Sequence, residues 1–405
     1  MTSPLLEDLR RAADSPAPKN FQPGVTYNGR MPSEIRTDAI PPVETEEEWE
    51  QAVEAMGVHI PKGYGLQLVE AILAGSTNDA AWHRDSDDKG RKHTAYTAPN
   101  TVQRWRYRFK VVLKSVLASE DIAVLAAEAR KAKRGRPLIV KTGGTMVIAL
   151  SDFQVGKTDR RGGSAELLER SEVALAKMIE QVKRIRPAEI HLYDGGDSTE
   201  GFESSPNAAR TNDLGLTEQL TVWRRIFWRW ISALSPLTER LVVAGVPSNH
   251  CAVRQGKNYV STTDDDFGIM TIGALQDIAS VNSEAFGHVE FYVPARHDEF
   301  LLLPAADDTP IGLAHGHQCG QPNQATDYIK KNSRRGIGQA KVVFLNHFHH
   351  LRIQAFGDDQ WMIMCPTNDN GSGWFEKSGE HSEPGVLSVI VEDGGWRDLY
   401  VAWTT

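Results

Sequence analysis

The sequence predicts an α/β fold with a small α+β module ahead of it. Short apolar runs typical of buried strands recur along the second part of the chain, at residues 146–150, 189–196, 241–246 and 341–346. Segments with helical periodicity lie between them, notably 164–185 and 215–233. Strands that alternate with helices predict βαβ units and a mainly parallel sheet. The tail, 351–405, has glycine turns between apolar runs and is expected to be more antiparallel.

Composition sets broad limits. The chain has 405 residues, of which 40% are hydrophobic and 24% charged, as in an ordinary soluble globular protein of one or two domains. The net charge of −8 gives no global sign of nucleic-acid binding, although a local basic face is compatible with it. The three cysteines, Cys251, Cys319 and Cys365, form no CxxC pair, which fits a reducing compartment. No secretory signal or membrane-spanning run is seen, so we expect a cytoplasmic protein without a membrane partner.

Three regions are expected along the chain. Residues 1–42, rich in Pro, Ser and Asn, are expected to be a mostly extended arm. Residues 43–140 form an accessory module that could bind nucleic acid or a partner, and residues 141–405 form the catalytic domain. Within the module, 45–57 is predicted to be a helix with acidic residues in its first turn.

The stretch 101–115, TVQRWRYRFKVVLKS, alternates strictly and is predicted to be a strand. One face carries cations and the other carries aromatic rings. Residues 101–141 contain eleven Lys or Arg and three Asp or Glu. A basic strip beside aromatic rings can bind a phosphate backbone and stack bases. The alternative is that the rings form the core face and the cations the solvated face.

Residues able to bind metal follow five predicted strands of the second domain, namely the four runs above and IGLA at 311–314. Imidazole and carboxylate groups that gather at the carboxyl edge of a sheet are typical of a functional site. The groups, in chain order, are Asp152 and Gln154, Asp197 and Glu200, Asn249 and His250, His315 and His317, and His347 and His349.

The order Asp-x-Gln, Gly-Asp, Asn-His, His-Gly-His, His-x-His resembles the motifs of the calcineurin-like metallophosphoesterases, over residues 145–350. The resemblance implies a four-layer αββα sandwich of two mixed sheets with a dinuclear metal site at the rim. In its layout, the chain looks closest to the bacterial and phage DNA-repair exonuclease-type members.

The resemblance also implies roles for the motif residues. One metal ion would be held by Asp152, Gln154, Asp197 and His349. The second would be held by Asp197, Asn249, His315 and His347, so that Asp197 bridges the two. His250 would act on the scissile phosphate as a general acid or transition-state stabiliser. Two divalent ions are implied, Mn²⁺ being favoured and Mg²⁺, Fe, Zn²⁺ or Co compatible. A hydroxide that bridges them would attack phosphorus in line.

Three positions depart from the family pattern. Gln154 stands where a histidine is usual, and an amide oxygen is a weaker donor. Ser248 and Asn346 stand where glycine is usual, at places that often require tight turns. The site is expected to survive all three changes, with the identity of the first metal left open.

Candidate substrate contacts come from the loops beside the motifs. Arg210, Arg254 and Lys257 could clamp phosphates, and His317 lies near the metal ligands in sequence. The Trp-rich helix at 215–233 is expected to face the core. The function predicted first is a phosphodiesterase or nuclease acting on DNA. The alternatives are a phosphomonoesterase acting on a phosphoprotein or small molecule, and a non-catalytic scaffold of the same fold. The oligomeric state is left open.

Overall fold

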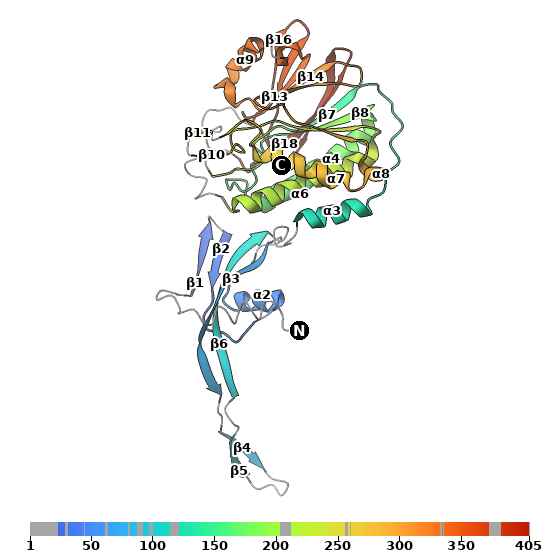
Figure 1. The fold of residues 1–405 in the computed structure, drawn as a ribbon. Helices are drawn as coiled ribbons and strands as arrows, with labels where there is room; N and C mark the ends of the chain where they lie inside the picture. The colour runs from blue at the N-terminus through green and yellow to red at the C-terminus, as the bar shows by residue number, and fades with distance from the viewer. Residues whose placement is uncertain are drawn as a thin grey trace. The chain divides into compact units, whose positions relative to one another are not determined.

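The computed structural model divides into two compact units, Met1–Leu117 and Ala118–Thr405 (Figure 1). The boundary expected from the sequence lies near residue 140, within the second of these units. The structure describes residues 23–28, 31–43, 45–60, 64–79, 82–86, 92–96, 100–113, 121–202, 212–255, 258–259, 261–332, 334, 336–371 and 382–404.

The first unit is built on a four-stranded antiparallel sheet in the order β1-β2-β6-β3. A separate two-stranded ribbon pairs β4 with β5. The strands are β1 Gly24–Asn28, β2 Met31–Arg36, β3 Tyr64–Asp79, β4 Trp82–Ser86, β5 Lys92–Tyr96 and β6 Asn100–Leu113. The expected extended arm therefore contributes two paired strands, because residues 24–36 complete this sheet. Helix α2, Glu46–Glu54, begins with a capping box between Thr45 and Glu48.

Strand β6 has the predicted alternation, and its aromatic face is the core. Trp105, Tyr107 and Phe109 are buried. Arg108, on the other face, is half-buried and lies 3.3 Å from the carboxylate of Glu70 on β3. The core-face alternative is thus confirmed for the rings. Buried rings cannot stack on bases, so any nucleic-acid contact of this strand would come from the cations alone.

The second unit contains two mixed sheets. The six-stranded sheet has the order β12-β9-β8-β7-β18-β19, in which β12, β9, β8 and β7 run parallel and β18 and β19 are antiparallel additions. Its strands are β7 Thr145–Leu150, β8 Glu189–Asp194, β9 Leu241–Gly245, β12 Val289–Tyr292, β18 Gly385–Glu392 and β19 Gly395–Trp403.

The five-stranded sheet has the order β13-β14-β15-β17-β16. Its three central strands run parallel, and an antiparallel strand closes each edge. The strands are β13 Phe300–Pro304, β14 Pro310–Ala314, β15 Val342–Leu345, β16 Arg352–Gly357 and β17 Gln360–Met364. The expectation of an antiparallel tail is wrong for β17, which extends the parallel ladder beyond β15. It holds for β16, β18 and β19.

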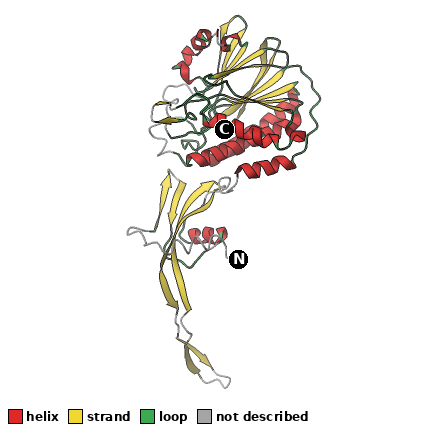
Figure 2. Ribbon diagram, in the orientation of Figure 1, coloured by secondary structure: helices red, strands yellow, loops and turns green. Residues whose placement is uncertain are grey.

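The two sheets pack face to face around one hydrophobic core. Alternate residues of the strands enter it, including Val147 of β7, Leu313 of β14 and Phe344 of β15. The intervening residues Val343 and Leu345 point to the other side of their sheet, where α9, Ala325–Lys331, packs. Helices α4 (Ser164–Ile185), α6 (Leu216–Leu234) and α7 (Phe267–Ser280) cover the six-stranded sheet (Figure 2). The α/β class is confirmed, and the layers follow the helix–sheet–sheet–helix order that the resemblance implies.

Two further short elements complete this side of the second unit. Helix α3, Asp121–Lys131, packs against α7. The amide of Asn282, the N-cap of α8 (Ser283–Phe286), donates hydrogen bonds of 2.9 and 3.0 Å to the carbonyls of Ala129 and Ala132 at the end of α3. This contact explains why residues from Ala118 onward group with the second unit.

The Trp-rich helix α6 faces the core as expected. Trp223, Trp228 and Trp230 are all buried, and the indole N–H of Trp230 donates to the Ser171 hydroxyl of α4 at 3.1 Å. Among the described residues, no helix is long and apolar enough to cross a membrane.

The packing of the two sheets can be tested with a pair of leucines on neighbouring strands. Leu313 on β14 is 0% exposed in the core, whereas Leu302 on β13 is 37% exposed. We expect Leu313→Ala to lower the free energy of unfolding by about 2–5 kcal/mol, because it leaves a cavity between the sheets. The control Leu302→Ala should cost less than about 1 kcal/mol. Chemical denaturation measures both, and equal losses would contradict the assignment of the core.

Candidate metal centre

The loops after five neighbouring strands meet at one rim of the sandwich. Strands β7, β8 and β9 are parallel neighbours in one sheet, and β14 and β15 in the other, so the carboxyl ends of each set lie at one edge of its sheet. The contact between His315, after β14, and Asp197, after β8, shows that the two edges meet. The backbone turns sharply there. Five non-glycine residues of these loops have positive φ: Asp152, Gln154, Asp197, His347 and His349. Such residues are uncommon and tend to cluster at functional sites.

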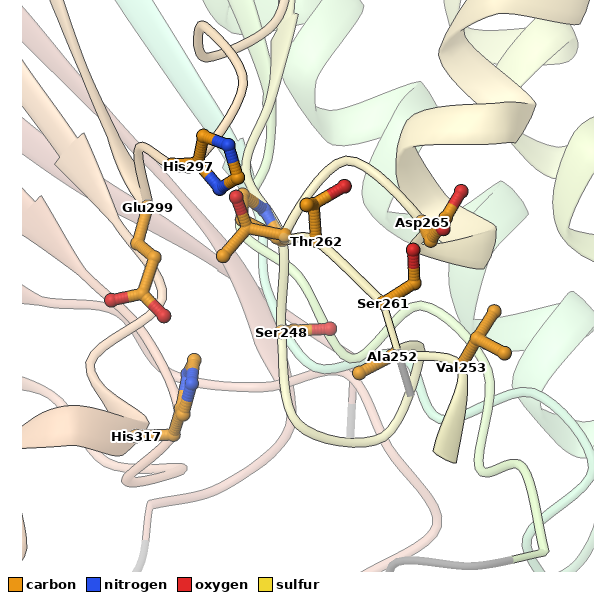
Figure 3. Close-up of a pocket in the computed structure, with 11 residues that line it drawn as sticks. Ser248, Ala252, Val253, Ser261, Thr262, Asp265, His297, Glu299 and His317 are labelled. Atoms are coloured by element: carbon orange, nitrogen blue, oxygen red, sulfur yellow. The ribbon is translucent and has the colours of Figure 1, made fainter. Parts of the chain in front are cut away.

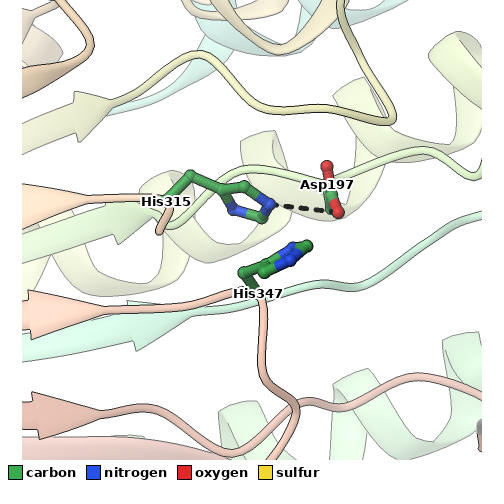
Figure 4. Close-up of side chains that lie close together, drawn as sticks. All are labelled: Asp197, His315 and His347. Carbon is green, nitrogen blue, oxygen red and sulfur yellow. Dashed lines mark ion pairs between the residues drawn. The ribbon is translucent and has the colours of Figure 1, made fainter. Parts of the chain in front are cut away.

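Asp197, His315 and His347 form the clearest candidate for a metal site (Figure 4). One ligand atom from each lies within 4.8 Å of the others. The Nε2 of His315 is 3.1 Å from Asp197 Oδ2 and 3.0 Å from Asn249 Oδ1. These are four of the residues predicted for one ion, and the structure brings them together.

The ring of His315 is oriented for such a role. Its Nδ1 lies 2.8 Å from the carbonyl oxygen of Gly195, which can only accept, so Nδ1 carries a proton. Burial lowers the pKa of His315, but Asp197 outweighs it and raises this pKa to about 9. Once Nε2 loses its proton to a bound cation, it presents its lone pair to the cluster. The close approach requires glycine at position 196, where φ is +90° and a Cβ would lie 2.7 Å from the His315 ring. The donor set therefore suits a divalent ion that accepts nitrogen and oxygen ligands.

Asp152 and His349 lie beside this cluster. Asp152 Oδ2 accepts a hydrogen bond from the backbone N–H of His347 at 3.0 Å. Asp152 Oδ1 is buried without a hydrogen-bond partner among the described residues, and lies 3.5 Å from His349 Nε2. A buried carboxylate oxygen in this state fits a place for a cation. The Nδ1 of His349 is 3.2 Å from Asp369 Oδ2, which sets the ring with Nε2 toward Asp152.

Gln154 reaches the rim, but its amide oxygen is engaged. Lys157 Nζ lies 2.6 Å from Gln154 Oε1 and 2.9 Å from Asp369 Oδ2. An ammonium can only donate, so the atom that it contacts is the amide oxygen and not the nitrogen. The amide Nε2 therefore faces His250, whose Nε2 is 3.5 Å away.

His250 is held by the loop that follows β8. Its backbone N–H donates to Asp197 Oδ1 at 2.8 Å, and its ring Nδ1 lies 2.9 Å from the Glu200 carbonyl and 3.2 Å from the Glu200 carboxylate. Burial lowers the pKa of His250, but the carboxylates of Asp197 and Glu200 outweigh it and raise this pKa to about 9. These carboxylates favour the protonated ring, which can donate a proton, whereas in the neutral ring Nε2 can accept from the Gln154 amide.

The pKa values of Asp197 and His347 are also shifted by their neighbours. Burial opposes ionisation of Asp197, yet His315 and His250 hold its pKa well below the usual value. Burial and the nearby His315 lower the pKa of His347 to about 2. An imidazole that stays neutral is ready to bind a cation without losing a proton first.

A cavity of 390 Å³ opens beside the cluster (Figure 3). His317, Ser248, His297 and Glu299 are among the residues that line it. The imidazole of His317 lines this cavity, and its ring centroid lies 5.5 Å from that of His315. Burial, with His315 next to it, lowers the pKa of His317 to about 3.

Of the three residues predicted to clamp phosphates, only Arg254 lies in the part of the chain that the structure describes. Arg254 lies on the short strand β10, Arg254–Gln255, which pairs with β11, Asn258–Tyr259. Arg210 and Lys257 lie outside the described residues. The role of all three stays a prediction.

Sequence reasoning missed Lys157 and Asp369. Asp369 follows β17, and the rule that located the other rim residues at ends of parallel strands would have located it as well. The expectation of an antiparallel tail hid that signal. Arg170 of α4, also missed, donates hydrogen bonds to the carbonyls of Asn368 and Asp369 and so fixes this loop.

The two residues that replace glycine have structural roles of their own. The Ser248 hydroxyl accepts a hydrogen bond from the Asp197 backbone N–H at 2.8 Å. The amide of Asn346 donates to the Ala314 carbonyl at 3.0 Å and packs against Gly195, where a Cβ would lie 2.3 Å from it. Both side chains thus support the turns that carry Asp197 and His315.

Comparisons with known proteins give limited likenesses. No family model matches the chain. It is 21% identical over 240 residues to the SPbeta prophage-derived uncharacterized protein YonJ of Bacillus subtilis, a match that covers 57% of this chain and 56% of that protein's length. Among solved structures, Vps29 of Chaetomium thermophilum is similar at a TM-score of 0.28 and 8% identity, over 64% of this chain and 94% of that one. PhoD is similar at a TM-score of 0.30 and 10% identity, over 78% of each chain.

The role of Ser248 can be tested by removing its hydroxyl. In Ser248→Ala, the buried N–H of Asp197 loses its acceptor, which we expect to lower the free energy of unfolding by about 1–3 kcal/mol. Ser280, at the exposed end of α7, is the control, and Ser280→Ala should change stability by less than about 0.5 kcal/mol. Thermal or chemical unfolding reports both, and a fully stable Ser248→Ala would show that the hydroxyl does not hold this turn.

Proposed function

We propose that this chain is a metal-dependent phosphoester hydrolase whose reaction centre is the rim around Asp197. The observation that supports it is the convergence of Asp197, His315 and His347 within 4.8 Å. Asn249 adds an amide oxygen beside His315. These four side chains would hold a divalent ion, and Mn²⁺ suits their mixture of nitrogen and oxygen donors. A bound ion would supply Lewis acidity toward a phosphoryl oxygen and lower the pKa of water for attack on phosphorus.

The chain's own residues would supply the rest. His250 is held by Glu200 through Nδ1, and its Nε2 lies 3.5 Å from the amide N–H₂ of Gln154. When this Nε2 is protonated, the ring presents an N–H beside the amide. Two such groups side by side can stabilise negative charge that develops on phosphoryl oxygens. His250 can also give its proton to the leaving oxygen as the ester bond breaks. Asp197 keeps this ring in place through the backbone N–H of His250.

The substrate class that we propose is a phosphodiester, with DNA as the first candidate. The 390 Å³ cavity beside His317 could take up a group attached to the phosphate, which a diester has on both sides. The surplus of cations in residues 101–141 favours a polyanionic substrate. A phosphomonoesterase would need neither feature.

Metal binding and proton donation can be separated by two variants. We expect Asp197→Asn to lose bound metal and turnover together, because it removes a ligand. His250→Gln should keep the wild-type metal content and lose turnover by about 10²–10⁴-fold, because it removes only the proton donor. Metal analysis and hydrolysis of bis-p-nitrophenyl phosphate with Mn²⁺ measure the two effects.

Exposed residues of the same types serve as controls. Asp277→Asn, on the outer face of α7, and His59→Gln, in the first unit, should behave as wild type. An emptied metal site in His250→Gln would refute its role as a non-ligand. Absence of hydrolysis by the wild type with Mn²⁺, Mg²⁺ and Zn²⁺ would refute the hydrolase itself.

The choice of substrate is tested with a panel. We expect cleavage of the diester bis-p-nitrophenyl phosphate and of single- or double-stranded DNA to exceed cleavage of p-nitrophenyl phosphate. DNA binding should weaken steeply with salt, by about 10³-fold or more between 50 and 200 mM if six phosphates are contacted. Preference for the monoester, or DNA binding that does not respond to salt, would favour a phosphomonoesterase instead.

A further inference from the structure

Lys157 places a fixed positive charge inside the rim. It follows Gln154 after a turn closed by the hydrogen bond from the Lys157 N–H to the Gln154 carbonyl, 3.1 Å, with Gly156 at φ +98°. The turn folds the lysine side chain back over Gln154. Its ammonium is mostly buried, at 13% side-chain exposure, and lies 2.6 Å from Gln154 Oε1 and 2.9 Å from Asp369 Oδ2. A buried ion pair of this kind leaves the lysine few other positions.

This contact changes what Gln154 can offer. A divalent ion bound through Gln154 Oε1 would lie next to an ammonium that donates to the same atom. The two cations would repel each other strongly in a buried site. The amide nitrogen, in contrast, lies 3.5 Å from the Nε2 of His250 and can only donate, either to that nitrogen or to an oxygen beside both groups. Gln154 is therefore placed as a hydrogen-bond donor and not as a metal ligand.

Lys157 also engages one of the rim's carboxylates. Its ammonium lies 2.9 Å from Asp369 Oδ2, which makes this carboxylate less available to a second divalent ion. Asp369 is committed to Lys157 and to the Nδ1 of His349, at 3.2 Å. The Glu200 carboxylate lies 3.2 Å from the Nδ1 of His250.

We propose that the ammonium of Lys157 takes the place of a second cation, so that the rim binds one divalent ion tightly, at Asp197, Asn249, His315 and His347. Lys157 acts as a positioning residue. It orients the Gln154 amide and offsets the negative charge of Asp369. The catalytic meaning of this arrangement rests on the proposed hydrolase function. The number of ions does not, since it can be counted without substrate.

The test counts ions on the full-length chain. The metal-free protein is titrated with Mn²⁺ by calorimetry, and bound metal is measured after gel filtration. We expect one tight ion per chain, with any second ion bound at least about 100-fold more weakly because of the ammonium. In Lys157→Met, which keeps the length of the side chain without its charge, the second ion should bind at least about 10-fold more tightly than in wild type. Lys157→Arg should keep the wild-type count.

Lys183→Met is the matched control, because Lys183 is exposed on α4 and pairs only with Glu180 among the described residues. Gln154→Leu gives a second measure that does not depend on Lys157. It should leave the tight ion's affinity within about 3-fold of wild type, whereas loss of a group that supports a metal typically costs 10–100-fold. If Lys157→Met does not fold, the ion counts of Gln154→Leu and Lys157→Arg still test the inference.

Two equally tight ions in the wild type, or an unchanged second-ion affinity in Lys157→Met, would overturn the inference. So would a loss of the tight ion in Gln154→Leu. A protein that binds one ion but hydrolyses no ester would instead refute the proposed function alone. A protein that hydrolyses diesters with two tight ions would refute only the replacement of a cation by Lys157.

Discussion

The rim depends on carboxylates that hold the loops as well as face the site. Asp152 uses Oδ2 to accept the backbone N–H of His347, and Asp197 uses Oδ1 to accept the backbone N–H of His250. Each carboxylate thus fixes a loop that comes from another strand. The remaining oxygens, Asp152 Oδ1 and Asp197 Oδ2, point toward imidazoles. The same side chains that would bind a cation therefore set the positions of the other ligands.

This double use explains how the left-handed backbone of the rim is maintained. A non-glycine residue at positive φ costs on the order of 1–2 kcal/mol. Hydrogen bonds between the loops offset this cost, among them Asp152 N–H to the Gly196 carbonyl at 3.2 Å and Gln154 N–H to the Asp197 carbonyl at 2.8 Å. Ser248 adds the acceptor for the Asp197 N–H. Each turn is strained by itself, and the hydrogen bonds between the loops stabilise the set.

The sequence could predict the rim residues because parallel strands obey a local rule. A buried apolar run locates a strand, and its carboxyl end is where side chains converge, so Asp197, His315 and His347 could be found without a structure. The same reasoning gave the helices at 164–185 and 215–233 to within one residue at either end. Pairing between strands is not local, and the parallel course of β17 beside β15 was accordingly missed.

The pair of Lys157 and Asp369 could not be predicted from local sequence patterns. The two residues are 212 positions apart, and only the fold brings the ammonium to the carboxylate. Seen from the sequence, Gln154 is a weak substitute for a histidine ligand. Seen in the structure, it is one partner of Lys157, three residues further along the same turn. A neutral histidine at position 154 could offer one ring nitrogen to a cation. The nearby ammonium of Lys157 would repel that cation. Gln154 and Lys157 therefore act as one unit. The amide oxygen accepts a hydrogen bond from the buried ammonium, and this bond turns the amide nitrogen toward the site.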